Sequence, residues 1–326
     1  MFFYELKKTF ICQKGLVLFL ACIMIQIFIL SQYNDYFGTD EYYYQNYIDQ
    51  FGDRIDDQTD EKLQNEEQRI AALYTELETT ENSVTAYKLQ QELECEGGFQ
   101  RYADRVRELR EDGRSPLLLK DAQYTLLFTN TPLSRSWVIL LCMSFAFLVI
   151  SVFYREKATH MELLQKSSLF GRRKLFYFKF LTLLLYFIPF CLLGAVLRLI
   201  WSSSHYRLDW DAPANCLEIF RETGITCSIR SIFFLGTLLQ CIFVVLALLL
   251  LSRLAELSKR RYLMPAIILG CTVIPTLLSP YFPVAWLQIV HNLFFIFTAS
   301  VYFISGTLLI LAVCAAFITE RKMRNE

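Results

Sequence analysis

The chain has 326 residues, of which 54% are hydrophobic and 20% are charged, and its 32 basic residues balance 32 acidic ones. This composition excludes an intrinsically disordered chain, a collagen-like protein and a strongly basic nucleic-acid-binding protein, so no nucleic-acid partner is expected. The high hydrophobic content also argues against a soluble domain.

Six apolar segments are long enough to cross a bilayer, which takes about 20 mostly apolar residues. None of the six contains Asp or Glu, and their only basic residues are Lys179 and Arg198, near the ends of the third. One such segment could be a buried core helix, but six in one chain predict an all-α polytopic membrane protein. The segments are Gly15–Ser31, Trp137–Tyr154, Phe176–Trp201, Ser231–Ser252, Leu263–Ser279 and Leu293–Thr319.

Basic residues in the short loops set the orientation, because cytoplasmic loops are enriched in Lys and Arg. With the N-terminus inside, the inner segments carry 17 basic and 6 acidic residues, and the outer ones carry 15 and 26. Both termini are therefore expected in the cytoplasm, with the first span acting as an uncleaved signal anchor. The net charge of zero thus becomes a segregation of charge across the membrane.

The segment between the first two spans, residues 32–136, is too long for a plain loop and predicts an extracellular helical domain. Tyr44, Ile48, Phe51 and Ile55 fit one face of a short helix. A second stripe then repeats every seven residues, as in a coiled coil, with Leu73 and Tyr87 between its members. The repeating residues are Leu63, Ile70, Leu77 and Val84.

A turn is predicted at Glu94-Cys95-Glu96-Gly97-Gly98, because paired glycines favour one. Phe99, Tyr102, Val106 and Leu109 then resume a helical face, so the domain is expected to be a helical, coiled-coil-like hairpin. Two roles remain open: recognition of a substrate or partner, or a spacer that packs on itself or on a second copy.

The second outer loop, residues 202–230, contains Cys216 and Cys227. An extracellular location would allow a disulfide between them. Because the chain has no other secretory disulfide framework, two free thiols are the alternative.

Motifs for common catalytic chemistry are absent. The chain has no G-x-x-x-x-G-K-[ST] phosphate loop, no H-E-x-x-H or paired C-x-x-C metal signature and no G-x-S-x-G elbow. We therefore expect no enzyme, no metal site and no cofactor bound by this chain. The polar residues at membrane depth, such as Gln26 and Gln240, are neutral, which favours an apolar or amphipathic substrate over ion coupling.

The inner loop after the second span, residues 155–179, is the most informative segment. Glu156, Thr159, Leu163 and Leu164 fit a short helix that lies along the membrane surface. The positive-inside rule explains the basic residues of this loop, but not the placement of Glu, Thr and the two leucines.

This loop, in a chain with six spans and both termini inside, resembles the permease subunits of type-2 ABC exporters. Two positions depart from the family's loop pattern: Ala158 stands where Gly is usual and Leu169 stands where Pro is usual. Residues 1–14 also look like the family's cytoplasmic amphipathic connecting helix. Its expected apolar side is Phe2, Phe3, Leu6 and Phe10, with Lys7 and Lys8 near lipid headgroups.

The resemblance implies that the loop is a coupling helix docked on a separate cytoplasmic ABC ATP-binding subunit, which would bind ATP and Mg²⁺. It also implies a second permease subunit, identical or not, and a multi-pass location in a bacterial plasma membrane. The residues expected at the ATPase interface are Glu156, Lys157, Thr159, Glu162, Leu163 and Leu164.

The segment from the fifth to the sixth span looks like the family's outer re-entrant element and is a candidate gate. The alternative is two helices joined by a Pro-rich outer turn with an interfacial Trp. The gate candidates are Pro275, Pro280, Pro283 and Trp286.

The expected function is therefore export of a peptide, drug or lipid-like substrate. The alternative is a membrane-anchored sensor or assembly protein whose outer hairpin binds a ligand or partner, without transport.

Overall fold

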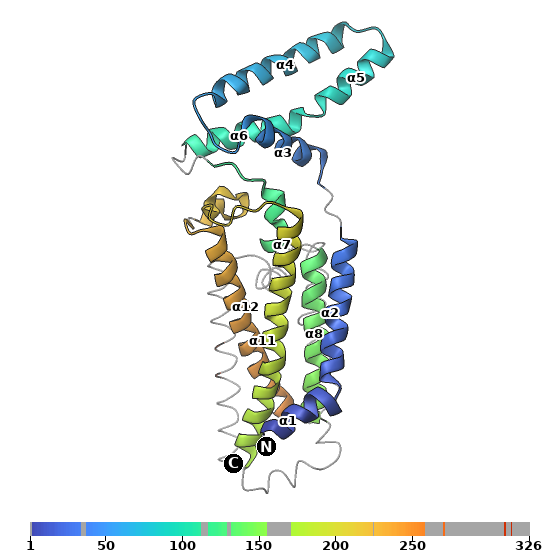
Figure 1. Cartoon of the computed structure of the whole chain (residues 1–326), viewed down its shortest axis with the longest axis vertical. Helices are drawn as coiled ribbons and strands as arrows, with labels where there is room; N and C mark the ends of the chain where they lie inside the picture. Colours follow the sequence, from blue (N-terminus) through green and yellow to red (C-terminus); the bar gives the residue numbers. More distant parts are fainter. Residues whose placement is uncertain are drawn as a thin grey trace. The chain divides into compact units, whose positions relative to one another are not determined.

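The computed structural model describes residues 2–33, 37–111, 117–128, 132–154, 171–223 and 225–257, with the isolated positions 270, 310 and 314. Within these residues the fold is all-helical, and extended backbone pairs only at two isolated bridges. The chain divides into two compact units (Figure 1). The bundle unit comprises Met1–Tyr33, Thr125–Arg207 and Phe233–Glu326, and the hairpin unit comprises Asn34–Tyr124 and Leu208–Ile232.

The bundle unit contains helices that are long and apolar enough to cross a membrane. Four such stretches occur in the described residues: Gly15–Gln32, Ser136–Phe153, Leu175–His205 and Ile229–Leu246. They overlap the first four predicted spans, which confirms a chain with several apolar helices of membrane-spanning length. The fifth and sixth predicted spans, Leu263–Ser279 and Leu293–Thr319, lie outside the described residues.

The described elements of the bundle unit are all helical and come from separate stretches of the chain. Two of them, η1 and η3, are short π-helical segments at helix ends. The elements are α1 (Phe2–Lys7), η1 (Lys8–Cys12), α2 (Gly15–Gln32), α7 (Thr125–Phe128), α8 (Pro132–Val149), η3 (Ile150–Tyr154), α11 (Gly171–His205) and α12 (Ile229–Leu257).

The core of the bundle lies where α2, α8 and α11 meet, with Val244 and Leu248 of α12 in the same cluster. Trp137 stacks on Phe190 with ring centroids 4.3 Å apart. A Cβ on Gly194 would lie 2.0 Å from Nε1 of Trp137, so this position of α11 requires glycine. Aromatic packing thus sets how closely α8 and α11 approach.

The hairpin unit is built on the pair α3 (Thr39–Phe51) and α6 (Glu96–Glu111). The predicted inner faces are confirmed: Tyr44 and Ile48 of α3 are buried, and so are all four predicted residues of α6, Phe99, Tyr102, Val106 and Leu109. Gly52 ends α3 with a φ of 106°, a backbone conformation that residues with a side chain rarely adopt. Ile55, predicted on the same helical face, therefore follows the end of the helix, and it packs on the core from there.

The predicted heptad stripe is interrupted, because the chain turns at residues 80–82 between α4 (Thr59–Thr79) and α5 (Ser83–Leu93). Leu63 and Ile70 are buried, whereas Val84 is 63% exposed and Tyr87 is also exposed. The amide of Val84 donates to the side chain of Asn82 at 3.0 Å, so Asn82 caps α5 and starts a new helix. The expectation of one continuous coiled-coil face was therefore wrong.

The paired glycines have a different role from the predicted one. The turn falls at residues 94–95, and Gly97 and Gly98 lie inside the first turn of α6. A Cβ on Gly98 would lie 2.7 Å from the backbone nitrogen of Tyr44 and 2.5 Å from Cβ of Tyr43. These glycines therefore allow α6 to approach α3 closely.

Three short 3-10 segments complete the hairpin unit: η2 (Asp121–Tyr124), η4 (Ala214–Cys216) and η5 (Glu218–Thr223). The last two come from the second predicted outer loop, so parts of both predicted outer segments pack in one unit. The side of a membrane on which these segments lie stays a prediction.

Candidate functional site

The predicted ATPase interface and the predicted gate lie outside the described residues, and both stay predictions. The interface set is Glu156, Lys157, Thr159, Glu162, Leu163 and Leu164. The gate set is Pro275, Pro280, Pro283 and Trp286.

The N-terminal segment contacts both helices that flank residues 155–170. The ring of Phe2 lies 6.4 Å from that of Phe178 in α11, and the ring of Phe10 lies 5.9 Å from that of Tyr186. On the other side, Nε2 of Gln13 donates to the backbone oxygen of Ser151 in η3 at 3.0 Å. The segment therefore joins η3 to the first half of α11.

The face that this segment turns to the bundle differs from the predicted apolar side. Glu5, Thr9 and Gln13 are buried, while Phe3 is 80% exposed. The reason is helical spacing: these polar residues recur every four positions beside Phe2, Leu6 and Phe10, whereas Phe3 points about 100° away from Phe2. Polar groups therefore share the contact with the bundle.

The segments that carry Cys216 and Cys227 are hydrogen-bonded to each other in the hairpin unit. The amide of Ala214 donates to the backbone oxygen of Cys227 at 2.9 Å. Neither cysteine forms a disulfide; Cys216 is buried and Cys227 is exposed. The disulfide alternative is therefore absent from this structure.

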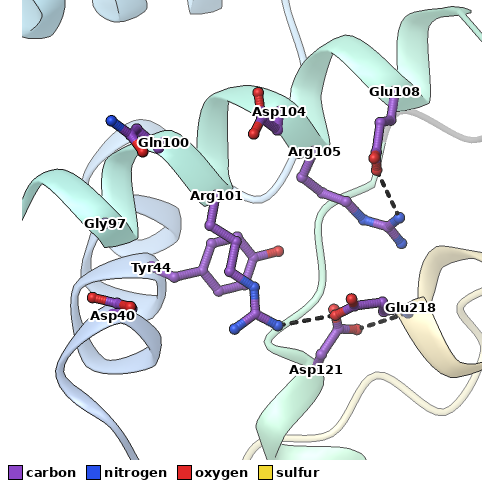
Figure 2. A pocket seen from close by; sticks show the side chains of 10 residues that line it. All are labelled: Asp40, Tyr44, Gly97, Gln100, Arg101, Asp104, Arg105, Glu108, Asp121 and Glu218. Atoms are coloured by element: carbon purple, nitrogen blue, oxygen red, sulfur yellow. Dashed lines mark hydrogen bonds and ion pairs between the residues drawn. The ribbon is translucent and has the colours of Figure 1, made fainter.

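The hairpin unit contains a polar cavity of about 360 Å³ (Figure 2). Its size lies in the range of small-molecule sites. Residues from α3, α6, η2 and η5 line it: Asp40, Tyr44, Gly97, Gln100, Arg101, Asp104, Arg105, Glu108, Asp121 and Glu218.

Arg101 of α6 is held by an aromatic ring and two carboxylates. Its guanidinium lies 5.0 Å from the centroid of the Tyr44 ring, a cation–π contact. Nη1 lies 2.5 Å from Oε2 of Glu41, and Nη2 lies 3.0 Å from Oε2 of Glu218. Burial opposes the charge, but Glu41 and Glu218 outweigh it and raise the pKa of Arg101.

Arg105, one helical turn further along α6, is only 7% exposed. Its Nη2 donates to the backbone oxygen of Cys216 at 2.6 Å, and its Nη1 lies 3.4 Å from Oε2 of Glu108. The Arg105 side chain therefore connects α6 to η4 through this hydrogen bond, and it also forms part of the cavity lining.

Asp121 of η2 differs from the two arginines because it has no oppositely charged side chain paired with it. The residue is 7% exposed, and its Oδ1 accepts a hydrogen bond from the amide of Glu218 at 3.3 Å. Among the described residues no Lys or Arg lies within ion-pair distance of its carboxylate. Burial raises the pKa of Asp121 to about 7, although the charge of Arg105 opposes the shift.

Sequence reasoning missed this cavity, although one signal for it was available. Arg105 falls on the buried stripe of Tyr102, Val106 and Leu109, where a charge needs partners. Asp121 and Glu218 come from segments almost 100 positions apart, and no spacing in the sequence joins them.

The described residues contain no group of three or more His, Cys, Asp or Glu side chains placed to hold a metal ion. The carboxylates that line the cavity are therefore not arranged as a shared metal site. An open volume lined by both acidic and basic side chains is instead compatible with a small organic ligand of matching charge.

Comparison with protein-family models, with curated proteins and with solved structures finds no match to this chain. The resemblance to type-2 ABC permeases therefore depends on the residues quoted for it, and function has to be argued from the chain itself.

Proposed function

We propose that the protein is the membrane permease subunit of an ATP-driven exporter. It pairs with a second permease subunit, and ATP is hydrolysed on a separate cytoplasmic ATP-binding subunit. The observation that carries the proposal is the N-terminal segment, which contacts both helices flanking residues 155–170. The cargo is a peptide, drug or lipid-like molecule.

The mechanical argument starts from that contact. A docked ATPase moves the segment it touches, and the movement has to reach the membrane helices as a rigid displacement. Gln13 holds η3 and Phe2 holds α11, so a push on residues 155–170 would move both helix ends together. A free loop would dissipate the same push.

The polar groups in the interior of the bundle support an apolar or amphipathic cargo. Ser136 donates to Oε1 of Gln26 at 3.0 Å, and Cys22 lies 3.4 Å from Ser144. These two pairs are neutral and hydrogen-bonded, unlike the ionisable relays of ion-coupled carriers, and the buried cations Lys179 and Arg198 lie toward the two ends of α11. Energy for transport would then come from the partner ATPase.

Co-purification of the full chain tests the proposal. A stoichiometric ATPase should accompany the unmodified protein and be lost on Glu156→Arg or Leu163→Asp. Glu67→Arg is the matched control, because Glu67 is exposed in the hairpin unit and makes the same charge change elsewhere. A stable protein without an ATPase, or an ATPase retained by both loop variants, would overturn the proposal.

A membrane-anchored sensor is the second candidate, and the cavity of the hairpin unit favours it. A sensor needs a ligand site but no ATPase. Ligand binding by a protein that purifies without a nucleotide-binding partner would support this alternative.

A further inference from the structure

We infer that the cavity of the hairpin unit binds an organic cation and that Asp121 is the counter-ion of the ligand's ammonium or guanidinium group. The inference does not depend on the proposed transport function, because an exporter and a sensor could both carry such a site.

The charges that line the cavity favour a cation. Its described lining contains five carboxylates and two guanidinium groups. The two arginines are already compensated: Arg101 by Glu41 and Glu218, and Arg105 by Glu108 and a backbone oxygen. An anionic ligand would have to displace these partners, whereas a cation meets carboxylates in excess.

Asp121 singles out one position within that lining. A carboxylate this deeply buried normally has a cation or several hydrogen bonds, and Asp121 has one hydrogen bond from a backbone amide. Figure 2 shows its carboxylate beside Glu218 and facing the cavity residues of α6. A ligand cation beside it would supply the missing partner.

The shape of the site separates an organic cation from a metal ion. The described carboxylates form no cluster that could hold a metal. The cavity volume equals that of about a dozen water molecules in the liquid, which is far more than one ion requires. A short alkyl chain that ends in an ammonium group, free or as the side chain of a peptide, suits this volume.

The test measures binding to the purified full chain by calorimetry at pH 8, with two probes that carry the same group. One is 1,5-diaminopentane and the other is a blocked Gly-Lys-Gly tripeptide, so the two arms distinguish free amines from peptide side chains. Diacetylated 1,5-diaminopentane is the neutral control, and MgCl₂ controls for charge alone.

Asp121→Asn keeps the size of the side chain and an acceptor for the Glu218 amide while it removes the charge. It should weaken binding of the better probe about tenfold to a hundredfold, the loss expected for one charged hydrogen bond. Glu67→Gln removes one charge from the exposed surface of the same unit and should leave binding unchanged.

A second readout needs no variant and serves if Asp121→Asn fails to fold. In the unmodified protein the affinity should increase by up to tenfold for each unit by which the pH is raised toward about 7, because the cation binds the ionised carboxylate. Above about pH 7 the affinity should level off. The charged groups that act on Asp121 are Arg101 and Arg105 of α6 and Glu218 of η5. The titratable phenols coupled to it are those of Tyr44 in α3 and Tyr124 in η2.

Three results would overturn the inference: equal binding by Asp121→Asn and the unmodified protein, equal binding of the neutral control, or no binding of either probe at millimolar concentration. Binding of MgCl₂ as tight as that of the amines would be a fourth such result. None of these results bears on the ATPase, so failure of the site and failure of the transport proposal are distinguishable.

Discussion

The two units place their side chains in opposite ways. In the bundle unit, Met24 is 66% exposed while Gln26 of the same helix is buried. In the hairpin unit, the aromatic Tyr102 is fully buried while Glu67 faces outward. Large apolar surfaces are unstable in water, and exposed charges are unstable in lipid. The contrast therefore indicates that one chain is built for two solvents.

Ion pairs occur in both units: Lys8 pairs with Glu5 in the bundle unit, and several exposed pairs lie on the hairpin unit. Pairs such as Arg69 with Glu66, Arg107 with Glu67 and Arg110 with Asp60 lie on the hairpin unit. Exposed pairs of this kind contribute little to stability, typically about 0–1 kcal/mol each. Such pairs mainly keep the surface soluble. Because they add little stability, the stability of the hairpin unit has to come from its aromatic core.

The largest expected effect is on that core. Tyr102→Ala removes a ring that packs 5.6 Å from the ring of Phe51 and should lower the free energy of unfolding of the hairpin unit by about 3–5 kcal/mol. Hydrogen exchange of the α3 and α6 amides in the full chain measures it. The bundle amides should keep their protection, because the two units have separate cores.

Tyr102→Phe is the matched control. The buried hydroxyl of Tyr102 has no hydrogen-bond partner in the described part of the chain. Removing it should leave stability unchanged or raise it, since the desolvation cost of the hydroxyl disappears. A large loss for the Phe variant would show that the hydroxyl, not the ring, stabilises the core.

The next expected effect compares the two surfaces directly. Met24→Asp places a charge near the middle of α2 and should cost about 2.5–3.5 kcal/mol of membrane insertion. Val84→Asp makes the same kind of change at a side chain as exposed, 63% against 66%, and should alter stability by less than about 0.5 kcal/mol. The fraction of protein recovered folded in membranes reports both. Equal behaviour of the two variants would contradict the assignment of different solvents.

The sequence was most informative where one periodicity dominates. The apolar runs predicted α2, α8, α11 and α12, and the spacing of Tyr102, Val106 and Leu109 predicted the inner face of α6. These predictions succeed because burial in lipid or in a core imposes a pattern on consecutive residues.

The sequence was less informative where distant segments meet. Gly98 was interpreted as a turn residue, but its requirement comes from the backbone of Tyr44 on another helix. The cavity likewise joins Asp121 to Glu218, which no local pattern connects. Such features depend on tertiary contacts, and a periodicity within one segment cannot reveal them.

The smallest expected effect, taken over one pH unit, is a pH dependence that should belong to the hairpin unit alone. The pKa of Asp121 is about 7 in the folded protein and about 4 in an unfolded chain, so folding takes up a proton between these values. Its contribution to stability is fully present below pH 4 and is lost as the pH rises to about 7, by at most about 1.4 kcal/mol per pH unit.

Asp121→Asn should remove this slope, measured by hydrogen exchange of the α6 amides corrected for intrinsic rates. The amides of α8 serve as the internal control, because the polar groups buried against α2 are neutral. A slope that persists in the variant would assign the proton to another group in the unit.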